Sequence, residues 1–470
     1  MAKVEIMSPV DVAWLSMEEP TNLMMVNAII TFDRPLDFDR VRQVLRYRWL
    51  RYHRFRQRVV RPPVPLLRPY WEDDPHFDLD LHLQRIALPA PGDRATLQEM
   101  VSDLMSGPLD FARPPWKFII IENYGEGCAI MGRLHHCLAD GMALVGVLLA
   151  MTDFTPDAPL TPIEPATNGE AAQSWAGGLA RDLGDNVGVA RAAVGEMLRR
   201  ARDREAVVAL GEQGAGLGLA AGRLLARSPD PRTRLKGKLG VLKRAAWADP
   251  IPLTDIKFIK NTFGGTVNDV LVSAVTSGLR RYLVDKGDNV GDDGGGLEIR
   301  AAIPVNLRRD EDNGKLGNRF GLVFLTLPIH IEQPLMRLVE VRRRMLELKR
   351  SAEAPVTLGI LGAMGYGTDA FREFVVRTLE PKATLVLTNV PGPPIPLYMA
   401  GQRIRDLMFW VPQAGRLSLG ISILTYAGNV HLGIVTDAGL VPCPEEVLAG
   451  VVAEVGRLKT LAVAVTARGA

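Results

Sequence analysis

Cysteine is scarce in this sequence, and its pattern argues against two kinds of stabilising site. Three cysteines occur, Cys128, Cys137 and Cys443, and none belongs to a CxxC pair. An odd count without paired spacing disfavours both a disulfide framework and a zinc site built from thiolates. The sequence therefore fits a reducing compartment such as the cytoplasm.

Long apolar runs are also missing. No stretch reaches the roughly 18 uninterrupted apolar residues that a membrane-spanning helix needs. The nearest candidate, Ala206 to Ala226, is interrupted by Glu212, Gln213 and Arg223. Met1 to Pro9 lacks the basic and apolar regions of a secretory signal. We therefore expect any membrane contact to be peripheral.

Net charge is small, since 56 basic residues nearly balance 53 acidic residues and leave a formal charge of +3. This excess is too small for a nucleic-acid-binding surface over the whole molecule. Basic residues gather locally in the stretch 171–245, which we interpret as surface helices. That stretch is either a solvated connecting face or a basic surface that rests on anionic lipid.

The 470-residue chain is longer than one ordinary domain, because single cores stop growing near roughly 250–300 residues. Its apolar content of 47% is typical of a globular protein. A proline-rich segment between Thr155 and Thr167 indicates a linker. We therefore predict an N-terminal subdomain at 1–154, a linker and basic helical connector at 155–247, and a C-terminal subdomain at 248–470.

Hydrophobic periodicity predicts helices and strands mixed in both subdomains, which is the pattern of an α/β protein. Helices are expected over residues 38–53, 95–106, 142–151, 268–286, 334–350 and 444–458. Strands are expected over residues 77–83, 116–122, 128–134, 298–304, 322–331, 419–426 and 430–436. The glycine-rich block 356–367 is expected to be a flexible loop, or else a wall with room for a long apolar substrate.

The strongest signal for chemistry is the run His135-His136-Cys137-Leu138-Ala139-Asp140-Gly141. It falls where a predicted strand turns into a predicted helix, a common place for catalytic groups. Histidine has an unperturbed pKa near about 6.5, so it is largely neutral in the cytoplasm and can accept a proton. Asp140 is near enough in sequence to fix the loop or the ring, and Gly141 permits a tight turn. We predict that His136 is a general base for a hydroxyl group.

Other interpretations of this run are less favoured. Neighbouring side chains of an extended strand point to opposite faces, so only one of His135 and His136 can face a given cavity. A zinc site is disfavoured because the sequence has no HExxH and no third ligand at helical spacing. Cys137 as a nucleophile is disfavoured because its side chain would project away from His136. A structural histidine is the remaining alternative.

The run matches HHxxxDG, the signature of the bacterial wax ester synthase/diacylglycerol acyltransferase (WS/DGAT) family. Plant BAHD acyltransferases and peptide-synthetase condensation domains share this signature, but the sequence contains no DFGWG of the BAHD type. Pro114-Pro115-Trp116 resembles the family's PLW element, with Pro115 where leucine is usual. Further segments that resemble WS/DGAT blocks are Met7–Leu15, Arg54–Arg58, Thr266–Val270, Pro304–Arg308, Gly317–Arg319 and Thr388–Pro393.

The resemblance implies an α/β fold of two chloramphenicol-acetyltransferase-like subdomains, with the active-site tunnel at their interface. It also implies an O-acyltransferase that moves a long-chain fatty acyl group from acyl-CoA to a fatty alcohol or diacylglycerol, by direct attack without an acyl-enzyme. Acyl-CoA would then be a co-substrate, and no metal or bound cofactor is expected. The protein would lie in the cytoplasm, peripherally associated with the inner membrane or lipid inclusions.

The resemblance also suggests roles for individual residues. Asp140 would hold the loop, through an arginine, while Asn268 would position the oxyanion or the substrate. The N-cap of the following helix is an equally good explanation of Asn268. The remaining candidates are motif support from His135, Gly141 and Asp269, and packing or a weak substrate contact from Trp116.

Two other functions fit the same fold. One is a non-catalytic lipid-binding or droplet-coating protein, and the other is a condensation-type acyltransferase that uses carrier-protein thioesters. The second is weakened because no carrier domain accompanies this chain. The sequence does not indicate the preferred acceptor, the acyl length, the oligomeric state or the depth of membrane contact.

Overall fold

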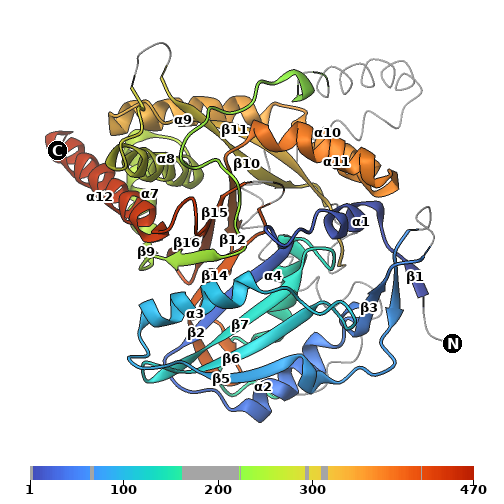
Figure 1. The fold of residues 1–470 in the computed structure, drawn as a ribbon. Helices are drawn as coiled ribbons and strands as arrows, with labels where there is room; N and C mark the ends of the chain where they lie inside the picture. The colour runs from blue at the N-terminus through green and yellow to red at the C-terminus, as the bar shows by residue number, and fades with distance from the viewer. Residues whose placement is uncertain are drawn as a thin grey trace, which may run out of the picture.

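The structure is a computed structural model that describes residues 4–63, 68–160, 222, 224–291, 296–308, 316–413, 415 and 417–469. Among these residues, the strands form two large sheets and one small sheet. The large sheets lie one above the other in Figure 1, with helices packed against them. Most of the predicted basic segment 171–245 lies outside the described residues.

The lower sheet in Figure 1 has the strand order β13-β14-β2-β7-β6-β5. Neighbouring strands are antiparallel, except that β5 runs parallel to β6. The β6–β7 pair confirms the predicted hairpin that leads into the histidines. The strand bounds are Met25–Phe32 for β2, Leu83–Ala87 for β5, Trp116–Tyr124 for β6, Gly127–His135 for β7, Tyr398–Met399 for β13 and Gln402–Trp410 for β14.

The upper sheet has the order β11-β10-β12-β15-β16-β8, with β9 paired beside β16. Strands β10, β12 and β15 run parallel, and β15–β16 is the predicted hairpin. The bounds are Lys243–Trp247 for β8, Ile251–Pro252 for β9, Glu298–Asn306 for β10, Phe320–Pro328 for β11, Leu385–Pro391 for β12, Leu419–Tyr426 for β15 and Asn429–Asp437 for β16.

Helices cover the outer face of the upper sheet, and the small sheet lies beside the N-terminal helix (Figure 1). The small sheet consists of β1 (Val4–Ile6), β4 (Tyr70–Asp73) and β3 (Gln57–Val60). The helices are α1 Pro9–Ser16, α2 Phe38–Val44, α3 Arg94–Ser106, α4 Gly141–Met151, α7 Leu253–Phe263, α8 Val267–Asp285, α9 Pro334–Lys349, α10 Glu353–Tyr366, α11 Asp369–Leu379 and α12 Pro444–Gly469. None of these described helices is long and apolar enough to cross a membrane.

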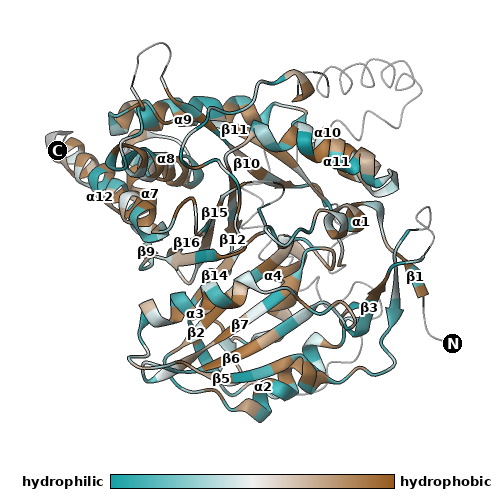
Figure 2. Ribbon diagram, viewed as in Figure 1, coloured by the Kyte–Doolittle hydropathy of each residue, from teal (hydrophilic) through white to brown (hydrophobic). Residues whose placement is uncertain are grey.

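The central strands are the most apolar part of the molecule, as Figure 2 shows. Helices α7, α8, α9 and α12 bury apolar side chains against the upper sheet. Both faces of the lower sheet are buried, one against α2 and α4 and the other against α3 and β8. Every residue of β7 is consequently buried. The histidine run begins at the end of this strand.

Two strands do not follow the predicted subdomain boundaries. Strand β14, from the C-terminal part of the chain, pairs with β2 of the lower sheet. Strand β8 falls inside the predicted helical connector 155–247, yet it pairs with β16 of the upper sheet. Trp247 of β8 and Trp410 of β14 meet with ring centroids 5.7 Å apart. The contact between these two strands joins the lower and upper sheets. The predicted subdomain boundaries stay predictions.

One other local prediction was confirmed only in part, and another was wrong. The helix expected over 38–53 ends at Val44 and continues as a π-helical turn, Leu45–Trp49, that places Trp49 in the core. The strand expected over 77–83 is a 3₁₀ turn at Leu79–Leu81 followed by β5. The Asp78 side chain accepts a hydrogen bond from the main-chain nitrogen of Asp80, which favours a turn although leucines alternate there.

The glycine-rich block 356–367 is also different from the flexible loop that we expected, because it forms most of α10. Its glycines serve close packing at one position. A Cβ atom on Gly365 would lie 1.9 Å from the main-chain oxygen of Pro9, the first residue of α1. Helices α1 and α10 therefore pack backbone to backbone at Gly365, because glycine has no side chain to separate them.

Two glycines of α10 give opposite predictions for the same substitution. Gly365→Ala should lower the free energy of unfolding by about 1–3 kcal/mol, because the new methyl group overpacks the contact with α1. Gly359 has open space around its missing Cβ, so Gly359→Ala should raise stability by about 0.5–1 kcal/mol through helix propensity. Urea unfolding measures both, and equal effects would contradict this account of α10.

Candidate active site

The two adjacent histidines lie on opposite sides of the chain as it leaves β7. His135 is the register partner of Met25 in β2, so both side chains lie on the face that packs against α3 and β8. The His136 nitrogen donates to the main-chain oxygen of Met24 at 2.7 Å, which continues the pairing one residue further. The His136 ring therefore faces the other way, as the sequence predicted for an extended strand.

His135 is held at both ring nitrogens. Its Nε2 lies 2.8 Å from Oε2 of Glu18, and its Nδ1 accepts a hydrogen bond from the Cys137 nitrogen at 3.1 Å. Burial raises the pKa of Glu18, but the hydrogen bond and charge interaction with His135 outweigh this and lower it. His135 thus ties the histidine loop to the segment before β2, which fits the support role that the sequence suggested.

His136 is almost completely buried, with 4% of its surface exposed. Its ring stacks on Trp14 at a centroid distance of 4.1 Å, and Phe320 of β11 lies at 5.5 Å. Within the described residues, its Nδ1 has no hydrogen-bond partner. Burial lowers its pKa to about 4, although the charge of Asp140 opposes that shift. The ring is therefore neutral at physiological pH and able to accept a proton.

Asp140 joins the histidine loop to the other half of the molecule. It is the N-cap of α4, where its Oδ1 accepts from the Ala143 nitrogen at 2.9 Å. Nε of Arg308, just beyond β10, donates to its two oxygens at 3.1 and 3.0 Å. The Arg319 nitrogen, just before β11, donates to Oδ2 at 2.9 Å. Both carboxylate oxygens thus accept hydrogen bonds that hold the loop in place. The arginine expected to hold Asp140 is Arg308.

Asn268 lies at the start of α8, but it is not the N-cap. Thr266 is the cap, and Asp269 completes a capping box by accepting from the Thr266 nitrogen at 2.8 Å. Asn268 is half-buried, and its Oδ1 accepts from Nδ2 of Asn389 on β12 at 2.8 Å. Among the described residues its own Nδ2 is left without a protein partner. The cap explanation of Asn268 was therefore wrong, and a free amide donor remains.

The other candidates have structural surroundings. Trp116 is buried and donates from Nε1 to the Phe55 oxygen at 2.8 Å, which makes it a packing residue. Cys137 is fully buried, and burial raises its pKa well above the usual value, so no thiolate is available as a nucleophile. Gly141 begins α4, and a Cβ there would meet open space. The structure therefore shows no obstruction that would require glycine at this position. No cluster of metal ligands occurs in the described part of the chain.

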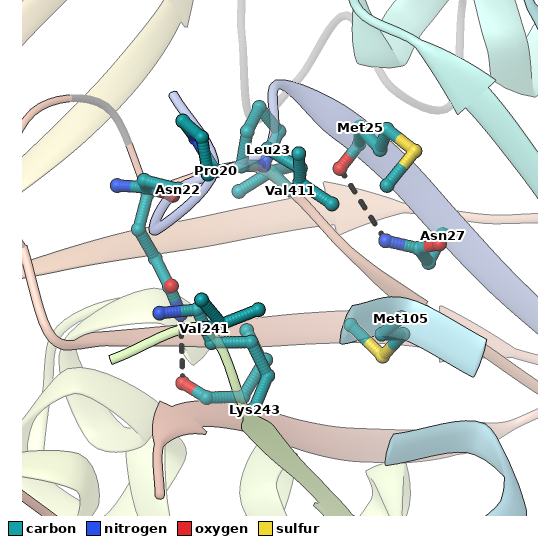
Figure 3. A pocket seen from close by; sticks show the side chains of 12 residues that line it. Pro20, Asn22, Leu23, Met25, Asn27, Met105, Val241, Lys243 and Val411 are labelled. Carbon is teal, nitrogen blue, oxygen red and sulfur yellow. Dashed lines mark hydrogen bonds between the residues drawn. The ribbon is translucent and has the colours of Figure 1, made fainter. Parts of the chain in front are cut away.

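A small, solvent-open cleft lies between the two sheets. In Figure 3, Met25 and Asn27 of β2, Met105 of α3 and Lys243 of β8 surround it. Because Met25 and His135 share a face, this cleft lies on the His135 side of β7. The expected tunnel beside His136 stays a prediction.

Sequence reasoning missed the direct neighbours of His136. Trp14 stacks on the ring, and Asn318 donates to the His136 carbonyl at 2.7 Å. Both residues belong to segments that resemble family blocks, Met7–Leu15 and Gly317–Arg319, but neither segment suggested a role. Their separation in sequence hid the fact that they meet at one histidine.

Comparison with solved structures identifies the fold. A wax ester synthase/diacylglycerol acyltransferase from Marinobacter aquaeolei VT8 superposes with a TM-score of 0.68 at 22% identity, covering 97% of this chain and 99% of the other. The first condensation domain of the calcium-dependent antibiotic synthetase superposes at 0.62 with 16% identity, covering 98% and 96%. The fold is thus the α/β fold of the chloramphenicol-acetyltransferase-like acyltransferases, as predicted.

Sequence comparison then gives the family. Residues 7–271 match the wax ester synthase/diacylglycerol acyltransferase catalytic domain, and residues 316–459 match the WS/DGAT C-terminal domain. A Mycobacterium tuberculosis protein named "probable diacylglycerol O-acyltransferase" is 31% identical over 411 residues, which are 86% of this chain and 84% of that protein. The chain belongs to the WS/DGAT family and is an acyltransferase of that type.

The Asp140–Arg308 contact gives a stability prediction. Only 5% and 8% of these side chains are exposed, so Asp140→Ala removes one charge of a buried ion pair and should cost about 3–5 kcal/mol of unfolding free energy. The exposed pair of Arg42 and Asp80 is the control, and Asp80→Ala should cost less than about 1 kcal/mol. Urea unfolding measures both. Similar losses in the two variants would show that Asp140 does not tie the halves together.

Proposed function

We propose that this protein transfers a long-chain fatty acyl group from acyl-CoA to the hydroxyl group of a fatty alcohol or of diacylglycerol. The products are a wax ester or triacylglycerol and free CoA. The observation that carries the proposal is the buried, neutral His136 at the contact between the two halves, in a chain of the WS/DGAT family. The diacylglycerol O-acyltransferase names of its relatives support the acceptor class.

His136 acts as the general base in this proposal. Its imidazole takes the proton of the acceptor hydroxyl while that oxygen attacks the thioester carbonyl carbon. The tetrahedral intermediate then expels CoA as a thiolate, which takes the proton back from the imidazolium. No acyl-enzyme forms, consistent with the high pKa of the buried Cys137 thiol. The charge of Asp140 favours protonated His136 and so stabilises the transient cation.

We assign Asn268 to the oxyanion or to substrate positioning. Asn389 donates to the Asn268 oxygen, which orients the amide and leaves its nitrogen free to donate. A donor that is fixed before reaction stabilises developing negative charge without further reorganisation. The half-buried position at the start of α8 also adds the positive end of that helix dipole.

Peripheral contact with a membrane or lipid inclusion belongs to the same proposal. Exposed apolar side chains occur on α10 and α11, where Tyr366 and Phe374 are 71% and 63% exposed. Such side chains suit a protein that takes an apolar acceptor from a lipid surface. The cytoplasmic side of the inner membrane would supply both the lipid and the acyl-CoA.

A panel of acceptors with one acyl-CoA tests the activity. Thiol release from palmitoyl-CoA is followed with hexadecanol and with dioleoylglycerol, each in detergent and in vesicles. His136→Ala should lower turnover by at least about 10²-fold, the scale of a positioned general base, while His53→Ala, at an exposed histidine, should not.

The outcomes of this panel separate the alternatives. Turnover with neither acceptor would favour the non-catalytic lipid-binding function, and turnover only with a carrier-protein thioester would favour a condensation-type enzyme. Near-normal turnover of His136→Ala would remove His136 from the mechanism. Turnover in detergent but never on vesicles would contradict uptake from a lipid surface.

Asn268→Ala tests the oxyanion assignment. We expect kcat to fall by about 10²–10³-fold, as when one oxyanion donor is lost, with little change in thermal stability because Thr266 and Asp269 still cap α8. Asn389→Ala is the matched variant, since it leaves the Asn268 amide in place but unoriented, and a smaller loss is expected. A change in stability alone would contradict the assignment.

A further inference from the structure

Helix α1 and the segment 316–319 both contact His136, although neither has a role in the mechanism above. They overlap the segments Met7–Leu15 and Gly317–Arg319, which resemble family blocks. Helix α1 lies in the N-terminal part of the chain, whereas residues 316–319 lie just before β11 of the upper sheet. Two distant segments thus converge on one buried imidazole.

The Asn318 side chain holds the main chain of His136. Its Nδ2 donates one hydrogen bond to the His136 oxygen at 2.7 Å and another to Oδ1 of Asp11 at 2.8 Å. Both hydrogens of the amide are therefore used. Asn318 and Asp11 are 9% and 6% exposed, so water does not compete for these bonds. Asp11 fixes the amide, and the amide fixes the carbonyl.

Trp14 holds the ring of the same residue. It follows Asp11 by three residues on α1, so both side chains lie on one face of the helix. Its ring is stacked on the imidazole with an interplanar angle of 21°. Trp14 is 4% exposed, and its flat face excludes water from one side of the imidazole. One helix therefore contacts the ring directly and the carbonyl through Asn318.

Helix α1 is itself fixed in place, which a positioning element requires. Ser8 caps it by accepting from the Asp11 nitrogen at 3.2 Å. The Met7 nitrogen donates to the Pro69 oxygen at 3.0 Å, which attaches the start of the helix to the small sheet. Gly365 of α10 packs against Pro9 without an intervening side chain. Contacts from three directions leave α1 little freedom to move relative to His136.

We propose that Trp14, Asn318 and Asp11 are positioning residues that keep the His136 imidazole oriented and shielded from water for proton acceptance. This inference rests on the proposed general-base role of His136. None of the three needs to touch the substrate. They act through His136, so their loss should change its titration and the chemical step more than substrate binding.

The titration of His136 distinguishes positioning from ordinary packing. Burial lowers its pKa to about 4, and hydrogen bonding by its own main chain and by Asn318 opposes that shift. A general base works when it is neutral, so the wild-type kcat should stay constant as the pH falls from 8 to 5.5. Trp14→Leu admits water, which should raise the pKa towards the ordinary value of about 6.5 and lower kcat about tenfold over the same range.

Other ionisable groups lie near His136, and Asp11→Asn removes the titration of one of them. His135 and Asp140 flank it in the loop, Arg308 and Arg319 approach from the upper sheet, and Asp11 lies behind Asn318. Burial raises the pKa of Asp11 to about 6, against the hydrogen bonds of Asn318 and Ser8 and the charge of Arg54. Asp11→Asn removes this titration but keeps an oxygen that accepts from Asn318. This variant should retain the flat wild-type pH profile.

Control variants separate packing from positioning. Trp14→Phe keeps an aromatic face and should restore the flat profile. Trp49 is equally buried and stacked on Phe55 at 3.8 Å, away from His136. Trp49→Leu should lower the melting temperature as Trp14→Leu does, yet leave the pH profile unchanged. A shifted profile in Trp49→Leu, or a flat profile in Trp14→Leu, would overturn the role of Trp14.

Asn318 is tested independently through kcat and KM. Asn318→Ala should lower kcat at least about tenfold, a fraction of the general-base contribution, with KM values for palmitoyl-CoA and acceptor within about twofold. Asp11→Ala should have a smaller effect in the Asn318→Ala background than in the wild type, because it acts through Asn318. Additive losses, or losses confined to KM, would overturn this part.

His136→Ala, assayed alongside, separates the base role of His136 from the positioning role of its neighbours. An inactive His136→Ala with wild-type behaviour of the Trp14 and Asn318 variants would leave the base role intact and overturn the positioning role. An active His136→Ala would overturn both. If Trp14→Leu does not fold, the Asn318→Ala comparison and the Asp11 double mutant decide the matter.

Discussion

The Asp140 carboxylate is the interaction on which the arrangement of the site depends. It ends the histidine loop by capping α4, and it also accepts from the side chain of Arg308 and the nitrogen of Arg319. These donors belong to both halves of the molecule, so one buried group sets the start of α4 and the approach of the upper sheet. Removing one charge of a buried ion pair is strongly destabilising. The loop geometry and the contact between the halves are therefore a single feature.

Burial gives the candidate base its state as well as its position. All residues of β7 are buried, so the chain delivers His136 into an environment that disfavours a charged ring. Strand alternation turns His135 the other way, where Glu18 and the Cys137 nitrogen occupy its ring atoms. The two histidines thus have different surroundings because they are adjacent in an extended strand and face opposite sides. Of this pair, His136 keeps Nδ1 without a hydrogen-bond partner among the described residues, whereas Nε2 of His135 lies 2.8 Å from Oε2 of Glu18.

The sequence predicted local elements where periodicity and turn residues agreed, as in the β6–β7 and β15–β16 hairpins. It failed where a local pattern had a tertiary cause. The glycines of α10 were mistaken for a loop because the contact that needs Gly365 is with Pro9, more than three hundred residues away. Asn268 was offered as a cap although Thr266 and Asp269 do that work. The opposite facing of His135 and His136 and the arginine partner of Asp140 were predictable, whereas the contacts of Trp14 and Asn318 with His136 required the fold to bring distant segments together.

The proposed general base, His136, has a pKa lowered to about 4, so it would accept protons weakly before reaction, and the proposed mechanism has to account for this. General-base efficiency depends on the protonation state as well as on basicity, and a neutral imidazole is fully available at pH 7. The proton moves from the hydroxyl group to His136 while negative charge develops on the thioester oxygen. Asn268 is proposed to donate a hydrogen bond to that oxygen. At that stage the nearby Asp140 charge stabilises the imidazolium. In this proposal, shielding by Trp14 lowers the basicity of His136, but it also excludes water that would compete with the alcohol for the thioester.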